Sequence, residues 1–182
     1  FLPHGGGPLP ILGDKGHEKM VAFLKEIATK LGKPSAILVI SAHWEEEQAT
    51  ITGNSHPSII YDYYGFPTEA YKIQYAASGN PELANEICTQ LTANGIPARI
   101  DEQRGFDHGL FVPLKLMFPQ AQIPCLQLSL LKNLNPRSHI ALGKAIAFLR
   151  ERNVLIIGSG MSFHNLKTFF SNNIDSSKEN EE

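Results

Sequence analysis

The sequence contains only two cysteines and no run of basic residues. Cys88 and Cys125 lie far apart, in segments whose patterns predict a helix and a strand. We therefore expect reduced thiols, rather than a disulfide, in a cytoplasmic protein. The 16 lysines and arginines are balanced by 18 aspartates and glutamates, which gives a net charge of −2 at pH 7. This balance gives no electrostatic reason to expect a nucleic-acid partner.

Long hydrophobic runs are absent as well. A membrane-spanning helix needs about 20 consecutive apolar residues, and the apolar stretches here, such as 36–40 and 154–157, are far shorter. We therefore expect neither a membrane span nor a membrane-surface helix. The hydrophobic share of 42% is ordinary for a globular protein.

Both ends of the chain have the character of cut ends. The first residue is Phe1 rather than methionine, and residues 171–182 are polar, with Ile174 as their single apolar member. We expect one catalytic domain in residues 1–170, truncated at both ends, followed by a flexible polar tail or loop in residues 171–182. The length of 182 residues is enough for one α/β domain with a sizeable core. The sequence leaves the oligomeric state open.

Hydrophobic periodicity and turn residues predict strands that alternate with helices. Strands are expected at 36–40, 48–52, 71–75, 98–102, 123–130 and 154–158, with 71–75 at a sheet edge. Helices are expected at 14–31, 81–93 and 136–152, and a short helix or turn is expected at 112–118. This alternation predicts a single α/β domain with a largely parallel central sheet flanked by helices. The active site is expected at the carboxyl ends of the strands.

Four of the seven histidines occupy strand ends or positions beside glycine, namely His4, His43, His108 and His164. Because loops at the carboxyl ends of parallel strands converge, we expect these four side chains to face one cavity. Neutral imidazoles are good ligands for divalent metals. Considered alone, His4 has two equally plausible interpretations. It is either a ligand position, where the neighbouring glycines let the backbone approach closely, or an ordinary loop histidine in a turn. His43 suits a metal ligand or a buried histidine with satisfied hydrogen bonds.

Side chains next to these histidines have expected roles too. Asp107 can orient the ring of His108 by accepting its second proton, and Trp44 can shield a site at His43 from solvent. The remaining helical histidines, His17 and His139, are expected to face solvent.

The aromatic loop at residues 55–68 offers candidates for substrate binding. His56 can reach a substrate from this loop, and Tyr64 and Phe66 can line an aromatic substrate together with Tyr61 and Tyr63. The same aromatic residues are equally suited to packing on the core.

Five short motifs occur in order along the chain. They are His4-Gly-Gly-Gly-Pro8, Ser41-Ala-His43-Trp44-Glu45, Tyr61-Asp-Tyr-Tyr-Gly-Phe-Pro67, Gly105-Phe-Asp-His108-Gly-Leu-Phe-Val-Pro-Leu114 and Gly158-Ser-Gly-Met-Ser-Phe-His164-Asn165. Together they resemble the extradiol ring-cleavage dioxygenases of the LigB superfamily, specifically the 4,5-DOPA dioxygenase-like branch. The resemblance extends from Phe1 to about Phe170.

This resemblance implies a mononuclear Fe(II) site, with zinc in the same place in some members, and a catechol substrate that reacts with O2. By analogy, His4 and His43 are the first two metal ligands. His164 is the general base, although in some members it contacts the metal directly, and His108 is a second acid/base or substrate-positioning residue. The family's third ligand lies in a downstream Glu-His-x-x-Pro-Leu type motif that residues 165–182 do not contain. We therefore expect this chain to lack the third ligand.

Three functional hypotheses follow from these residues. The first is a metal-dependent extradiol dioxygenase that opens a DOPA-like catechol ring. The second is a zinc-dependent hydrolase, because histidines with a general base also suit metal-activated water. The third is a non-catalytic interaction protein similar to the Memo-like proteins, whose fold resembles that of the LigB superfamily. The presence of both His108 and His164 favours an enzyme.

Overall fold

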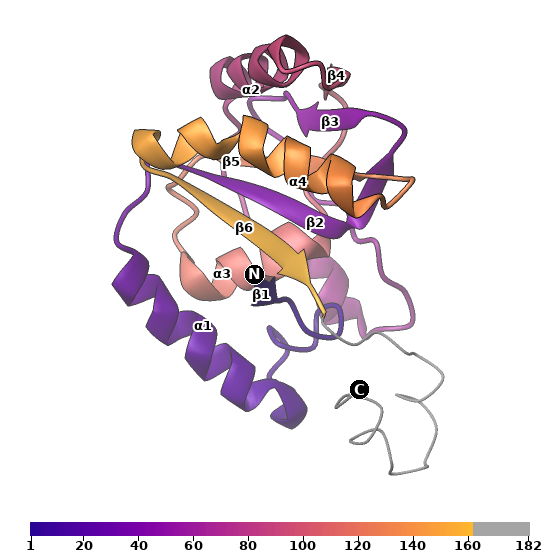
Figure 1. The fold of residues 1–182 in the computed structure, drawn as a ribbon. Coiled ribbons are helices and arrows are strands. Elements are labelled where there is room, and N and C mark those ends of the chain that lie inside the picture. The colour runs from indigo at the N-terminus through magenta and orange to yellow at the C-terminus, as the bar shows by residue number, and fades with distance from the viewer. Residues whose placement is uncertain (162–182) are drawn as a thin grey trace, which may run out of the picture.

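A six-stranded sheet forms the middle layer of the structure, a computed structural model that describes residues 1–161 (Figure 1). In chain order the strands are β1 (Leu2–Pro3), β2 (Ala36–Glu46), β3 (Ala49–Thr52), β4 (Ala98–Asp101), β5 (Cys125–Leu131) and β6 (Val154–Gly160). Their order across the sheet is β1-β6-β2-β5-β3-β4. The first four are parallel neighbours, whereas β3 is antiparallel to β5 and parallel to β4. The predicted α/β domain with a largely parallel sheet is confirmed.

Helices cover both faces of this sheet (Figure 1). The α-helices are α1 (Glu18–Leu31), α2 (Pro81–Ala93), α3 (His108–Met117) and α4 (Pro136–Ala145), and the 3-10 helices are η1 (Lys15–His17), η2 (Thr68–Lys72) and η3 (Ala147–Arg152). α1 and α3 contact each other on one face, and α2 and α4 contact each other on the other. Among residues 1–161, no helix is long and apolar enough to cross a membrane.

The continuous apolar run of β2 is explained by these two helical layers. Ile37 and Val39 belong to the core on the α1 and α3 side, while Ala36 and Leu38 belong to the core on the α2 and α4 side. Successive side chains of a strand point to opposite faces, so a strand that is covered on both faces needs apolar residues at every position. Cys88 and Cys125 are both free thiols, as predicted.

Helix termini match the sequence signals where capping residues are present. α2 begins at Pro81, and the Asn80 side chain accepts the backbone N–H of Leu83 at 3.0 Å. Both features were expected of an asparagine cap followed by proline. The helix predicted over 136–152 is instead divided, with α4 ending at Ala145 and the 3-10 helix η3 continuing to Arg152.

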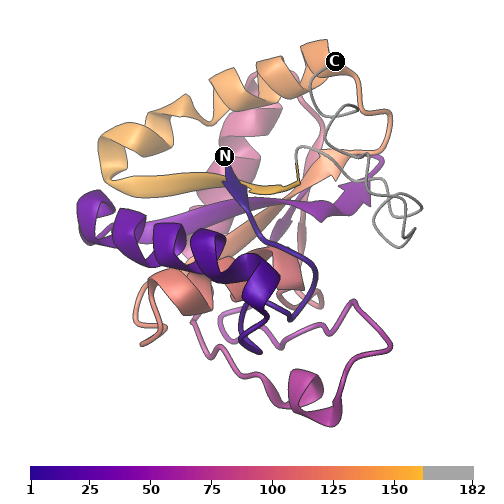
Figure 2. The ribbon, with the colours of Figure 1, turned by 90° about the horizontal axis from the view of Figure 1, so that it is seen from below.

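The edge strand predicted at residues 71–75 is wrong. Residues Thr68–Lys72 form the 3-10 helix η2 on the long excursion between β3 and α2, which Figure 2 shows projecting away from the sheet. Backbone carbonyls there are bound by side chains instead of by a neighbouring strand. The Tyr61 hydroxyl donates to the carbonyl of Ile73 at 2.8 Å, and the Tyr63 hydroxyl donates to that of Ala70 at 2.7 Å. Alternation alone does not reveal such local bonds.

We expect the buried face of β2 to dominate stability. Ile37→Ala should lower the free energy of unfolding by about 2–5 kcal/mol, because Ile37 is 0% exposed and its truncation leaves a cavity in the core. Ile140→Ala, at a helical position that is 60% exposed, should change it by less than about 0.5 kcal/mol. Urea unfolding followed by circular dichroism measures both. Similar losses for the two variants would contradict the placement of the core.

Candidate active site

Three imidazole rings meet at one end of the sheet. The ring centroid of His4 lies 4.7 Å from that of His43 and 5.0 Å from that of His108. The ring centroids of His43 and His108 lie 4.0 Å apart. One ring nitrogen from each residue lies within 4.8 Å of the others. His4 and His108 are buried, whereas His43 is more open to solvent. The structure therefore brings three of the four predicted histidines together, and His164 lies outside the described residues.

Strand pairing places His4. β1 pairs with the end of β6, so that Leu2 lies opposite Ser159 and Pro3 opposite Gly160. His4 follows directly, and its Nδ1 lies 3.0 Å from the Ser159 hydroxyl oxygen. Its Nε2 lies 3.0 Å from Nε2 of His43.

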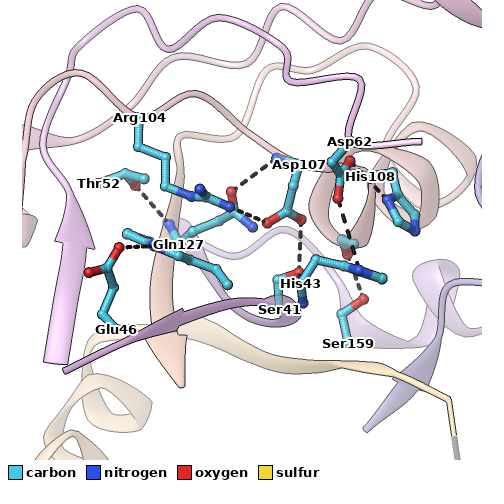
Figure 3. A network of polar contacts seen from close by, with 12 residues as sticks. Ser41, His43, Glu46, Thr52, Asp62, Arg104, Asp107, His108, Gln127 and Ser159 are labelled. Atoms are coloured by element: carbon cyan, nitrogen blue, oxygen red, sulfur yellow. Dashed lines mark hydrogen bonds and ion pairs between the residues drawn. The ribbon is translucent and has the colours of Figure 1, made fainter. Parts of the chain in front are cut away.

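An irregularity in β2 places His43. The pairing of β2 with β5 shifts register between Ile40 and Glu45, and His43 lies within the shifted stretch. Such bulges re-aim side chains at strand ends. The backbone N–H of His43 donates to the Ser41 hydroxyl at 3.2 Å, and this hydroxyl donates to Oδ1 of Asp107 at 2.8 Å (Figure 3). The bulge is thereby bound to the loop before α3.

His108 reaches the cluster by a route that the sequence did not predict. It was expected at the carboxyl end of a parallel strand, but β4, the strand before it, runs antiparallel to β2 and β5. The connection from 102 to 107 returns across the sheet, held by backbone bonds between Phe106 and the segment at Ser58 and Ile60. His108 is then the first residue of α3, which begins four residues before the short helix or turn predicted at 112–118.

Asp62 is the carboxylate that contacts His108. Its Oδ1 accepts the backbone N–H of His108 at 2.9 Å and lies 2.9 Å from Nδ1 of the same residue, in a contact poorly aligned for a hydrogen bond. Its Oδ2 lies 4.0 Å from Nδ1 of His43. Burial alone would raise the pKa of Asp62, but the close contact with the His108 ring and the hydrogen bond from its backbone N–H outweigh it and hold this pKa below its usual value. Asp62 therefore stays ionised beside two imidazoles.

The predicted role of Asp107 in orienting the His108 ring is wrong. Its fully buried carboxylate accepts the Ser41 hydroxyl and forms an ion pair with Arg104 at 3.0 Å (Figure 3). Adjacent side chains point apart here, so the neighbour in sequence is not the partner in space. The Arg104 guanidinium lies 4.4 Å from the ring centroid of Trp44, so Trp44 packs against this ion pair. The Trp44 indole N–H donates to Glu46 and lowers the pKa of that carboxyl.

Besides Asp62, the aromatic loop brings an aromatic ring to the cluster. The ring of Tyr63 lies 5.8 Å from that of His108, and Phe66 packs edge-on against Tyr63 at 5.5 Å. Burial raises the pKa of Tyr63 to about 12, so its hydroxyl stays protonated near neutral pH. Tyr64 is 92% exposed, and His56 is an exposed residue whose ring contacts Ser55.

The two histidines expected in solvent are bound instead. The ring of His17 accepts the backbone N–H of Gly6 at 3.0 Å and pairs with Asp14 at 2.7 Å, and it packs against Gly5 in the loop after His4. His139 accepts the backbone N–H of Leu131 at 3.1 Å. Their helical positions gave no sign of these bonds, because each partner lies outside the helix.

Comparison with known proteins identifies the family. The family model described as the catalytic LigB subunit of aromatic ring-opening dioxygenase matches residues 4–181. The chain belongs to the LigB family. A dioxygenase named tasH, from Hapsidospora irregularis, is 44% identical over 179 residues, which are 93% of this chain and 55% of that protein. The 4,5-DOPA dioxygenase extradiol of Beta vulgaris is 44% identical over 166 residues, 90% of this chain and 61% of that protein.

LigB relatives extend to bacteria and to solved structures. The 4,5-DOPA dioxygenase extradiol of Escherichia coli strain K12 is 35% identical over 169 residues, 92% of this chain and 60% of that protein. The crystal structure of an uncharacterized protein of Escherichia coli K12 matches with a TM-score of 0.68 and 31% identity, over 82% of this chain and 55% of that one. The chain spans a little over half the length of the relatives it matches.

Close packing between β2 and α3 should require glycine at position 109. A Cβ there would lie 2.3 Å from the Ser41 hydroxyl oxygen and 3.1 Å from Oδ1 of Asp107. Gly109→Ala should therefore lower the free energy of unfolding by about 1–3 kcal/mol and move His43 away from His108. Gly143→Ala, in α4 with open space around its Cβ, should instead raise it by up to about 1 kcal/mol. Urea unfolding of both variants checks the pair, and a neutral Gly109→Ala would contradict the packing.

Proposed function

We propose that the protein is a metal-dependent extradiol dioxygenase that inserts O2 into a catechol ring and opens it, with a DOPA-like substrate. The observation that carries the proposal is the 3.0 Å separation of Nε2 of His4 from Nε2 of His43 in a cluster that also contains His108. Membership of the LigB family supports the same reaction. The proposed metal is Fe(II), with zinc as the alternative in the same site.

The two imidazoles fit a metal ion. Ligands about 2.1 Å from one ion and about 90° apart lie about 3 Å from each other, which is the separation of these two Nε2 atoms. Imidazole nitrogens suit both iron and zinc. Fe(II) bound there would supply a redox-active Lewis acid with open positions for the catechol and for O2.

The other residues would position the substrate and move protons. Nδ1 of His108 lies at Asp62, so its Nε2 is the atom that can exchange a proton with a catechol hydroxyl. The ionised Asp62 would stabilise the imidazolium formed in that exchange. Tyr63 and Phe66 would wall the ring of the substrate. His164 is proposed as the general base that takes the second hydroxyl proton.

The metal site is tested first. His4→Ala and His43→Ala should each lower Fe(II) and Zn(II) affinity by more than about 100-fold, because each removes a ligand atom. His139→Ala, a histidine of α4 with its own backbone partners, should leave affinity unchanged. Anaerobic titration calorimetry measures the affinities. Unchanged binding in both ligand variants would refute the site.

The chemistry is tested by oxygen uptake. A form of the protein that also carries the third-ligand motif, loaded anaerobically with Fe(II) and then given a catechol, should consume O2 and release a ring-opened product, whereas its zinc-loaded form should not. Residues 1–182 alone, which do not contain that motif, should show little activity. Hydrolysis of ester or amide substrates by the zinc form, without O2 uptake by the iron form, would favour a hydrolase.

One experiment distinguishes an acid/base role of His108 from a role as a metal ligand. His108→Ala should retain the metal and lower turnover by about 10²–10⁴-fold, the usual contribution of a positioned acid or base. Metal content and rate are measured on the same preparation. Loss of metal together with activity would make His108 a third ligand and would end its assignment as an acid/base residue.

A further inference from the structure

The Ser159 hydroxyl joins two backbone segments and His4 in one short chain of contacts. Its oxygen lies 2.5 Å from the carbonyl oxygen of Gly109 in α3 and 3.0 Å from Nδ1 of His4. Ser159 is buried near the end of β6, opposite Leu2. The hydroxyl has only one proton to donate, so its two neighbours determine each other's role.

Pro113 explains why Gly109 takes that proton. In an α-helix the carbonyl of residue 109 accepts the N–H of residue 113. Position 113 of α3 is a proline, which has no N–H. A buried carbonyl without its helical donor needs another one, and the Ser159 hydroxyl supplies it at 2.5 Å. The short distance and the carbonyl's inability to donate fix the direction of this bond.

The proton on His4 follows from this direction. A hydroxyl whose proton points to Gly109 can only accept from His4, so Nδ1 of His4 must carry the N–H. In a neutral imidazole the lone pair is then on Nε2, the atom that faces Nε2 of His43 at 3.0 Å. A ligand to a metal must present this lone pair.

We propose that Ser159, with Pro113 and the Gly109 carbonyl, is a positioning element that fixes His4 in the Nδ1–H tautomer and so prepares Nε2 as a metal ligand. This inference rests on the proposed metal site. Contacts of this kind beyond the ligands are worth about 10–100-fold in metal affinity. Ser159 itself touches neither metal nor substrate in this role.

The tautomer is measured directly in the protein without metal. With 15N-labelled histidine, the side-chain nitrogen resonances of His4, assigned by their loss in His4→Ala, should show a protonated Nδ1 and an unprotonated Nε2. A neutral His4 with its proton on Nε2 would overturn the inference. This experiment needs no variant of Ser159, so it does not depend on how such a variant folds.

Zinc affinity tests the consequence. Ser159→Ala should lower it by about 10–100-fold, and Ser159→Thr, which keeps the hydroxyl, should recover most of the loss. Ser129→Ala is the matched control. Ser129 in β5 is also buried, and its hydroxyl accepts the backbone N–H of Thr50 in β3. It should leave zinc affinity unchanged. Equal affinity in wild type and Ser159→Ala would overturn the inference.

The proline is tested separately. Pro113→Ala restores an N–H to the helix at the position that serves Gly109, so the Ser159 proton can turn toward His4. The population of the Nε2–H tautomer of His4 should rise and zinc affinity should fall, although α3 gains a hydrogen bond. Unchanged His4 resonances would remove Pro113 from the element. If wild-type protein fails to bind zinc at all, the proposed metal site fails, whereas normal binding with the opposite tautomer removes only this inference.

Discussion

The buried carboxylate of Asp107 is the interaction on which the site depends. This carboxylate accepts a hydrogen bond from the Ser41 hydroxyl of β2 and forms an ion pair with the guanidinium of Arg104. The backbone N–H of Asp107 donates to the side chain of Gln127 in β5 at 3.2 Å. An ionised carboxylate in the interior is tolerated only when such partners surround it, and removing one leaves an uncompensated charge. The loop before α3 is thus fixed to the middle of the sheet. His43 and His108 lie on the two segments that this contact joins.

Local signals explain how much of the fold could be predicted. α2 begins and ends at the residues expected from Asn80, Pro81 and the glycine at 95, because capping is decided by a few neighbouring side chains. The run at 154–157 predicted a buried strand, since helices on both faces make every position apolar. The direction of β4 could not be predicted, because short strands carry no mark of which neighbour they join.

Sequence reasoning found the histidines but not the groups that hold them. Asp62 lies 46 positions before His108, and Ser159 lies 155 positions after His4. Nothing in periodicity or spacing joins such residues, so Asp107 was preferred for its adjacency. A signal for Asp62 was present in its motif, where an ionisable residue interrupts a run of aromatic side chains. An acidic group set among aromatic side chains needs a polar partner, and here that partner is a histidine.

The glycines beside His4 and His108, and the glycine at the end of β6, have a packing reason. A Cβ at position 109 would clash with the Ser41 hydroxyl. A Cβ at position 160 would lie 3.3 Å from the Cβ of Ala42. At position 5 the backbone has a φ of +76°, and a Cβ would lie 2.6 Å from the Pro10 ring. Three backbones must approach closely for three imidazoles to share one volume. Gly109 and Gly160 therefore mark places where segments distant in sequence touch, and glycine lies directly beside two of the three clustered histidines, His4 and His108.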